Sequence, residues 1–158
     1  DEASVSDVII DALNKRSKKA YDCVILLQPT SPIRVLGDLS SFIAQYRSNA
    51  DATSLISVCE ASTWSHPEFC RTIDASGLLS QQPKDSKIIG RQQVKNRYYY
   101  PNGSMYASKV SEFFRFKTFY QDNTAAFVMP KWKSIDVDDE TDFMIAESIL
   151  KNINAFVS

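Results

Sequence analysis

One stretch decides the fold of this chain: residues 24–34 read Val-Ile-Leu-Leu-Gln-Pro-Thr-Ser-Pro-Ile-Arg. The first four residues form a continuous apolar run, which is typical of a β-strand buried on both faces. In the turn that follows, two prolines fix the backbone, and an amide, two hydroxyls and a guanidinium supply hydrogen-bonding groups. In a parallel sheet such a turn lies at the carboxyl end of a strand, where open α/β proteins bind ligands. The stretch therefore predicts an α/β fold with a stiff turn over a pocket.

Helical and extended patterns alternate along most of the sequence. The spacing of apolar residues predicts helices over residues 5–13, 38–46, 109–114 and 141–153, and strands over residues 23–27, 54–59, 104–107, 126–129 and 134–137. The strand-helix-strand order of the first two strands predicts that they form a parallel pair. We therefore expect a mostly parallel sheet flanked by helices.

Residues 60–97 interrupt this alternation. The segment is more polar and is punctuated by proline and glycine, with short hairpin strands expected around residues 74–77. It is far longer than the ~2–6 residues of an ordinary connection between a strand and a helix. It also carries apolar residues that a solvated loop would not need, among them Trp64, Leu78 and Ile88. We interpret it as an inserted arm that covers a partner; the alternative is an arm folded back on its own sheet.

The composition indicates one soluble domain over residues 1–158. Apolar residues make up 44% of the chain and charged residues 23%, both ordinary for a globular domain. The formal net charge of −1 gives no reason to expect a nucleic acid or a membrane as a partner. No apolar run reaches the ~20 residues of a membrane span, and no signal peptide is visible. The three cysteines are widely spaced and indicate neither zinc nor a disulfide framework, so we expect a cytoplasmic protein.

Two carboxylates near the end of the chain are candidate metal ligands. In a strand over residues 134–137, Asp136 and Asp138 would share one face, because side chains alternate between the two faces of a strand. Two acidic side chains at this spacing can converge on one hard cation, and Mg²⁺ favours such oxygen ligands together with substrate phosphates. The alternative is that both are ordinary capping acids at the start of the next helix.

Three segments together resemble the acylneuraminate (sialic acid) cytidylyltransferase family. Residues 27–34, LQPTSPIR, are similar to its LQPTSPLR motif; residues 101–106, PNGSMY, resemble its NGxxY segment; and residues 134–138, SIDVD, resemble its metal-binding IDxD segment. The three occur in the family's order and span most of the chain. The resemblance implies a Rossmann-like nucleotidyltransferase fold.

The sequence departs from the family pattern at its start. The family opens with a strand and a glycine-rich basic loop, roughly ARxGSKxxxxKN, that holds the nucleotide triphosphate. None of the four glycines of this chain lies in such a loop. The chain therefore resembles the later two-thirds of such an enzyme, with the first strand and its loop missing.

The resemblance also implies a set of substrate-binding residues. It places Gln28 and Tyr106 at the sugar and the Asn102 side chain at the ligand. The alternatives are that the glutamine ties down its own turn, that the asparagine is an ordinary turn residue and that the strand tyrosine is simply half-buried. It places the aromatic pair of Phe119 and Tyr120 along the acyl-sugar site. Arg91 would hold a phosphate or the sugar carboxylate. The number of residues between Arg91 and Asn102 is one greater than in the family pattern.

The implied activity is a nucleotidyl transfer. The substrates would be CTP and an acidic nine-carbon sugar of the N-acylneuraminate type, with Mg²⁺ as cofactor on Asp136 and Asp138, which are the candidate catalytic residues. The arm at residues 60–97 would make a homodimer, and Arg91 would then serve the partner's site. Two alternatives remain: a non-catalytic domain that binds sugar and dimerises, and a cytidylyltransferase for a legionaminic- or pseudaminic-type acid.

Overall fold

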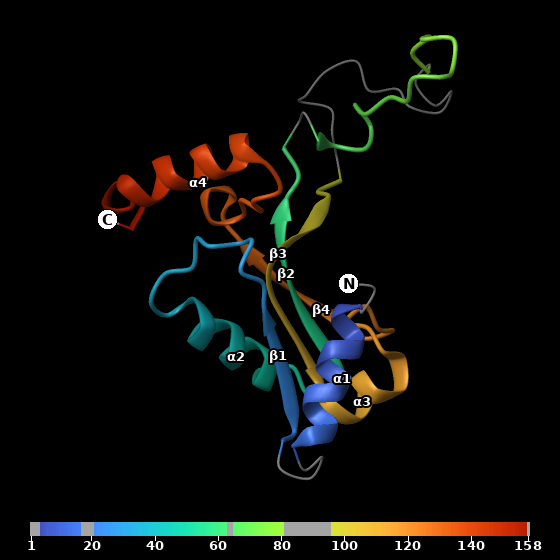
Figure 1. The fold of residues 1–158 in the computed structure, drawn as a ribbon, viewed down its shortest axis with the longest axis vertical. Helices are drawn as coiled ribbons and strands as arrows, with labels where there is room; N and C mark the ends of the chain where they lie inside the picture. The colour runs from blue at the N-terminus through green and yellow to red at the C-terminus, as the bar shows by residue number, and fades with distance from the viewer. Residues whose placement is uncertain (1–3, 17–20, 63–64, 81–95, 158) are drawn as a thin grey trace.

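The computed structural model describes residues 4–16, 21–62, 65–80 and 96–157. Its elements follow one another in this order: α1 (Val5–Lys15), β1 (Cys23–Leu27), α2 (Asp38–Ser48), β2 (Ser54–Glu60), β3 (Tyr99–Lys109), α3 (Val110–Phe116), β4 (Thr124–Met129), the 3₁₀-helix η4 (Lys131–Lys133), α4 (Glu140–Lys151) and α5 (Asn154–Val157). The predicted alternation of helices and strands is therefore present through most of the chain (Figure 1).

The four strands form one mixed sheet in the order β1-β3-β2-β4. β2 and β4 pair in parallel, whereas β3 runs antiparallel between β1 and β2. Three of the four strands thus share one direction, and the predicted α/β fold with a sheet flanked by helices is confirmed. The expected direct pairing of the first two strands is wrong. The strand-helix-strand order is a local signal, and it cannot reveal that a strand from much later in the chain inserts between the two.

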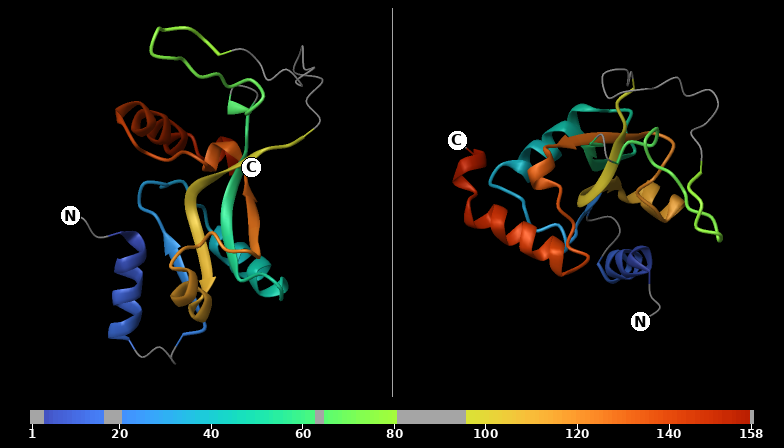
Figure 2. Two further views of the ribbon diagram at one scale, coloured as in Figure 1. Left: turned by 90° about the vertical axis from the view of Figure 1, so that its right-hand side faces the viewer. Right: turned by 90° about the horizontal axis from the view of Figure 1, so that it is seen from above.

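A hydrophobic core lies on each face of the sheet. On one face, α1 and α3 pack against β2, with Leu13, Ile56 and Phe113 among the buried residues. On the other face α2 covers the sheet, where Phe42 and Met105 are fully buried. The helices lie on opposite sides of the strands in both views from the side and from above (Figures 1 and 2). The two cores fix β3 as a central strand and so hold its first residues at one end of the sheet.

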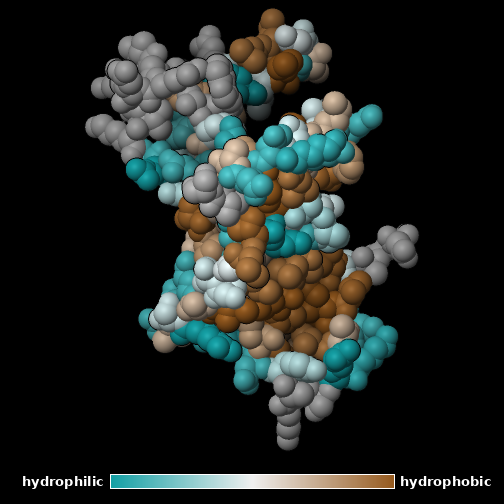
Figure 3. All heavy atoms as spheres, turned by 90° about the vertical axis from the view of Figure 1, so that its left-hand side faces the viewer, coloured by the Kyte–Doolittle hydropathy of each residue, from teal (hydrophilic) through white to brown (hydrophobic). Residues whose placement is uncertain are grey.

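β1 is an edge strand, although its sequence is that of a central one. Its first four residues are only half-buried, whereas the first six residues of β2 are buried. Two hollows of about 370 and 400 Å³ flank β1, and both are lined by Cys23 and Ile25. A broad apolar area is visible from this side of the molecule (Figure 3). Nothing in the described residues pairs with the outer edge of β1.

Residues 65–80, the longest described part of the arm, stand away from the sheet at the end where β2 stops and β3 begins (Figures 1 and 2). Its turn is held by Asp74, whose Oδ1 accepts hydrogen bonds from the amides of Ser76 and Leu78 at 2.9 and 3.0 Å. The expected hairpin is reduced to one antiparallel bridge between Ile73 and Leu79. Ile73, Leu78 and Leu79 are each more than 60% exposed.

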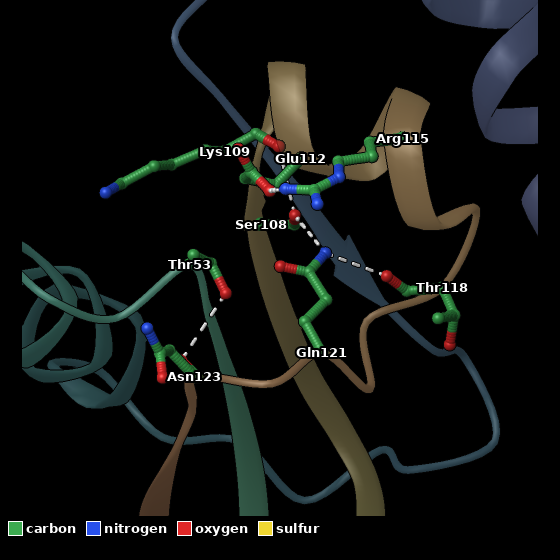
Figure 4. Close-up of polar contacts among 8 residues, drawn as sticks. All are labelled: Thr53, Ser108, Lys109, Glu112, Arg115, Thr118, Gln121 and Asn123. Carbon is green, nitrogen blue, oxygen red and sulfur yellow. Dashed lines mark hydrogen bonds and ion pairs between the residues drawn. The ribbon is translucent and has the colours of Figure 1, made fainter.

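A polar network ties the strands together at the opposite end of the sheet (Figure 4). The side-chain amide of Gln121 donates to Ser108 Oγ and to the carbonyl of Thr118, both at 2.9 Å. Its carbonyl oxygen, Oε1, is buried without a hydrogen-bond partner among the described residues. The hydroxyl of Thr53 reaches the carbonyl of Asn123 at 3.5 Å. This network joins β2, β3 and the loop before β4.

The long helix α4 is capped by an acidic residue but is largely exposed. Asp139 is its N-cap and accepts the amide of Asp142 at 3.0 Å. Among its apolar residues, Ala146 is buried, whereas Phe143 is 59% and Leu150 43% exposed. The apolar spacing was sufficient to predict a helix. It could not show that the described part of the chain leaves most of these apolar side chains uncovered.

Candidate functional site

Arg34 fixes the turn that follows β1. Its Nη1 donates to the carbonyls of Gln28 at 3.1 Å and Ser31 at 2.5 Å, and to that of Ser104 on β3 at 3.3 Å. One guanidinium therefore closes the turn on itself and fastens it to the neighbouring strand. The Arg34 guanidinium is therefore occupied by carbonyl groups and not by the carboxylate of Asp38.

Asp38 pairs instead with Lys133, which lies in η4. The Lys133 Nζ is 2.6 Å from Asp38 Oδ1, and the two side chains are only 12% and 14% exposed. The other carboxylate oxygen accepts the amide of Val35 at 2.8 Å. The first residue of α2 thus holds both the turn and the segment that leads to Asp136.

Asp136 lies beside the turn, but not on a strand. Residues 134–137 have no regular secondary structure, so the predicted strand, and with it the argument from side-chain alternation, is wrong. The segment is fastened by one backbone hydrogen bond, in which the amide of Val137 donates to the carbonyl of Thr30 at 2.8 Å. The Ser31 hydroxyl lies 3.2 Å from Asp136 Oδ1, and the same hydroxyl lies 3.1 Å from the carbonyl of Asn102. A tertiary contact therefore places this carboxylate.

Gly103 allows Asp136 to approach. Its φ of +75° lies in the left-handed region that favours glycine. A Cβ at this position would lie 2.6 Å from Ser31 Oγ and 2.8 Å from Asp136 Oδ2. Both distances are too short for non-bonded atoms. Any side chain at residue 103 would displace the serine or the carboxylate, so the glycine of the second motif is required by both conformation and space.

Asn102 is buried beneath this contact. Its side chain is 2% exposed. Its Oδ1 accepts the hydroxyl of Ser57 at 2.6 Å, and its Nδ2 donates to Ser134 Oγ at 2.8 Å. The Ser57 hydroxyl in turn accepts the amide of Met105 at 2.7 Å. The structure thus places the Asn102 side chain between β2 and the residues before Asp136.

An aromatic group lies next to Asp136. The rings of Tyr106 and Phe119 are 5.4 Å apart, and Phe119 packs on Phe113 in the core at 4.8 Å. Burial raises the pKa of Tyr106 to about 12, and the proximity of Tyr120 and Asp136 adds to the rise. Phe119 is buried, whereas Tyr120 is 58% exposed. Of the predicted pair, one ring supports Tyr106 and the other faces solvent.

The remaining predicted residues are less closely joined to this group. Gln28 is half-buried at the end of β1, and its carbonyl is held by Arg34. Asp138 is exposed, and its amide donates to Asp142 Oδ2 at 3.2 Å. Arg91 lies outside the described residues.

The structure also adds residues that sequence reasoning passed over. These residues are Ser31, Lys133, Ser57 and Ser134. Ser31 could have been found from its position inside the first motif. The other three carry no local signal, since their partners are far away in the sequence.

The donor set of this site suits a hard divalent cation. The described residues contain no group of three or more His, Cys, Asp or Glu side chains that could hold a metal ion. Mg²⁺, however, usually takes only one or two carboxylates and completes its shell with water and substrate phosphates. Asp136 beside Gly103 supplies one such carboxylate, and Asp138 follows two residues later in the sequence. An oxygen donor set built on the Asp136 carboxylate therefore fits Mg²⁺ bound together with a phosphate.

No helix in the part of the chain that the structure describes has the length and apolar character needed to cross a bilayer. No family model matches the sequence.

Comparison with known proteins gives one consistent picture. The chain is 30% identical over 144 residues to the N-acylneuraminate cytidylyltransferase of Streptococcus agalactiae, covering 91% of this chain and 33% of that protein. It is 28% identical over 154 residues to the enzyme of the same name from Escherichia coli O18:K1:H7, covering 98% and 35%. It is 29% identical to the CMP-N,N'-diacetyllegionaminic acid synthase of Legionella pneumophila, covering 96% and 64%.

A solved structure of CMP:2-keto-3-deoxy-manno-octonic acid synthetase complexed with CTP has the same fold, with a TM-score of 0.63 and 15% identity over 96% of this chain and 70% of that one. The chain spans about a third of the length of the N-acylneuraminate cytidylyltransferases it matches. The predicted resemblance is confirmed: over most of its own length, this chain is a homologue of the N-acylneuraminate cytidylyltransferases.

Proposed function

We propose that the protein carrying this chain transfers the CMP group of CTP to an acidic nine-carbon sugar of the N-acylneuraminate type. The anomeric oxygen of the sugar forms a bond to the α-phosphorus, and the bond between that phosphorus and the bridging oxygen breaks. Pyrophosphate leaves with the electron pair, and the hydroxyl proton passes to solvent. Such a reaction requires positioning and charge neutralisation more than covalent catalysis.

One observation carries the proposal. Three segments that resemble the family's motifs are far apart in sequence, yet Ser31, Gly103 and Asp136 lie in contact at one end of the sheet. A chance resemblance in three short segments would not require their side chains to meet. The meeting point also adjoins Tyr106, which the resemblance places at the sugar.

The residues take distinct roles in this proposal. Asp136 and Asp138 would hold Mg²⁺, which when bound neutralises phosphate charge and favours ionisation of the attacking hydroxyl. Gln28, Tyr106 and Tyr120 are the sugar-facing residues, since an amide and phenol hydroxyls suit polar sugar groups. Gln28 and Tyr106 are half-buried, whereas Tyr120 is 58% exposed and is therefore accessible to a ligand.

Arg91, Asn102 and Phe119 complete the proposed set. Arg91 would bind an anionic group, either a phosphate or the sugar carboxylate, through the fork of its guanidinium. Asn102 and Phe119 are buried in the structure, so we assign them to the wall behind the ligand. Asn102 supports the residues around Gly103, and Phe119 supports the Tyr106 ring.

The proposal also concerns which acidic sugar is the substrate. A legionaminic-type acid is the second candidate, because the Legionella relative with that printed activity matches at 29% identity and over 64% of its length. A cytoplasmic location and a homodimer belong to the same proposal. A domain that binds sugar without turning it over is the alternative in another class.

The test is an assay with defined acids. The gene product that contains this sequence is incubated with CTP, Mg²⁺ and, in turn, N-acetylneuraminate, a legionaminic-type acid, a pseudaminic-type acid and 2-keto-3-deoxyoctonate. We expect CMP-sugar by mass spectrometry and an equal amount of pyrophosphate with one of the nine-carbon acids. Saturable binding of a sugar without any CMP-sugar would establish the non-catalytic alternative and refute the transferase.

A further inference from the structure

We propose that Ser31 and Gly103 are positioning residues for the Asp136 carboxylate: the serine hydroxyl holds one carboxylate oxygen, and the missing side chain of the glycine gives the other oxygen its place. The inference rests on the proposed function, because it concerns the carboxylate that would bind Mg²⁺. It adds to that function two residues that touch neither substrate nor cation.

The burial of Ser31 supports this role. Its side chain is 0% exposed, and its hydroxyl has two acceptors, the Asn102 carbonyl at 3.1 Å and Asp136 Oδ1 at 3.2 Å. A hydroxyl has one hydrogen, so the two acceptors share it. A hydrogen bond to a charged carboxylate is roughly twice as strong as one between neutral groups, so the carboxylate is the favoured acceptor.

The two oxygens of Asp136 therefore have different surroundings. Oδ1 faces the Ser31 hydroxyl, and Oδ2 lies over the α-carbon of Gly103, where a Cβ would be 2.8 Å away. No described side chain donates to Oδ2. The carboxylate is thus held in one orientation, with Oδ2 left for a cation.

The backbone on both sides of Asp136 makes such a device necessary. Residues 134–137 are not in a strand, and the Val137 amide bond to Thr30 is the backbone contact of this segment with the turn. Without a ladder of hydrogen bonds, the direction of the Asp136 side chain depends on its own contacts. Groups behind a metal ligand commonly change metal affinity by about 10–100-fold when they are removed.

Mn²⁺ alone serves as the probe for the test. Paramagnetic broadening of the amide signals of Gly103 and Val137 in the gene product that contains this sequence reports binding near Asp136, and titration gives a dissociation constant. We expect Ser31→Ala to weaken Mn²⁺ binding by about tenfold. Ser31→Cys keeps most of the volume but replaces a strong donor with a weak one, so it is expected to behave as Ser31→Ala does.

Ser54→Ala is the matched control. Ser54 is also 0% exposed, and its hydroxyl lies 2.8 Å from Thr124 Oγ1 at the other end of the sheet. Urea unfolding is measured for all variants, so that a general loss of stability is seen separately. Both serine-to-alanine changes are expected to lower stability, and only the change at Ser31 to weaken Mn²⁺ binding.

The outcomes separate the two proposals. If the unaltered chain binds Mn²⁺ near Asp136 and both Ser31 variants bind it equally well, the positioning role is refuted while the proposed function stands. If the unaltered chain shows no broadening at Gly103 or Val137, the positioning role is refuted, and the proposed function is then decided separately by the assay for CMP-sugar. Gly103→Ala adds an independent check, since its Cβ should displace Asp136 and abolish the broadening at Val137 in a folded protein.

Discussion

Lys133 and Asp38 form an ion pair of 2.6 Å that joins the first residue of α2 to the segment leading to Asp136. Both side chains are largely buried, and the free oxygen of the carboxylate accepts the Val35 amide at 2.8 Å. The pair therefore connects the residues just after the first motif to the residue just before the third.

Lys133→Met is predicted to destabilise the fold by about 3 kcal/mol, because it leaves the Asp38 carboxylate buried without its cation. Urea unfolding measures the change in free energy. The control is Lys151→Met, which breaks an ion pair with Glu147 whose side chains are 68% and 52% exposed and should cost at most ~0.5 kcal/mol. Equal losses for the two variants would show that the Lys133 pair is not a structural link.

Asp136→Asn and Asp138→Asn are each predicted to lower turnover by about a hundredfold or more while leaving the fold intact, because each removes one anionic ligand from the proposed Mg²⁺ site. Initial rates of pyrophosphate release by the gene product measure the effect. Asp122→Asn, which changes an exposed acid at the other end of the sheet, is the control and should keep its rate. Near-normal turnover of both variants at low Mg²⁺ would remove the pair from the metal site.

The sequence predicted β1 and the turn after it because their signals are local. Four consecutive apolar residues and two prolines need no distant partner to define a strand and a stiff turn. The position of β3 between β1 and β2 was missed, because strand pairing is decided by residues far apart in the chain. Met105 and Ala107 of β3 are fully buried, as a central strand requires. Their spacing in the sequence does not reveal which strands pair with β3.

The candidate site was predicted only in part, because most of its contacts join residues that are far apart in the sequence. Asp136 was predicted as a metal ligand through an alternation that the structure does not contain, and the structure places it beside the first motif. Its true support is the Ser31 hydroxyl and the space above Gly103. The role of Arg34 in closing the turn could not be predicted, since its three carbonyl acceptors are backbone groups, which no sequence pattern reveals.

Residues 1–158 alone are predicted to bind CTP weakly or not at all, because the sequence has no glycine-rich run of backbone amides, which usually cradles phosphates. Isothermal titration with CTP and Mg²⁺ is the measurement. A dissociation constant in the micromolar range would contradict the prediction and would place phosphate recognition in residues not yet identified.

Tyr106 is predicted to make the fold sensitive to alkaline pH. Its pKa of about 12 in the folded chain lies above the ordinary value of 10.0, so the folded state keeps the phenol proton more firmly than the unfolded state. That contribution to stability is complete below pH 10 and is lost as the pH rises from 10 to 12. Tyr106→Phe has no proton to lose, so its urea stability should fall less over this range. An equal fall in both proteins would show that Tyr106 does not titrate as described.

The arm is predicted to mediate a homodimer. In its described part, Ile73, Leu78 and Leu79 are 69%, 66% and 64% exposed, which is unfavourable for apolar side chains unless another surface covers them. Replacing Leu78 and Leu79 together by Asp should shift the protein toward monomer in sedimentation velocity at micromolar concentration, as should deletion of residues 60–97. Leu36→Asp is the control, since Leu36 is fully exposed on the turn before α2, away from the arm. A monomer in the unaltered protein would refute the dimer and with it the sharing of Arg91 between subunits; a dimer that survives both changes would move the interface elsewhere.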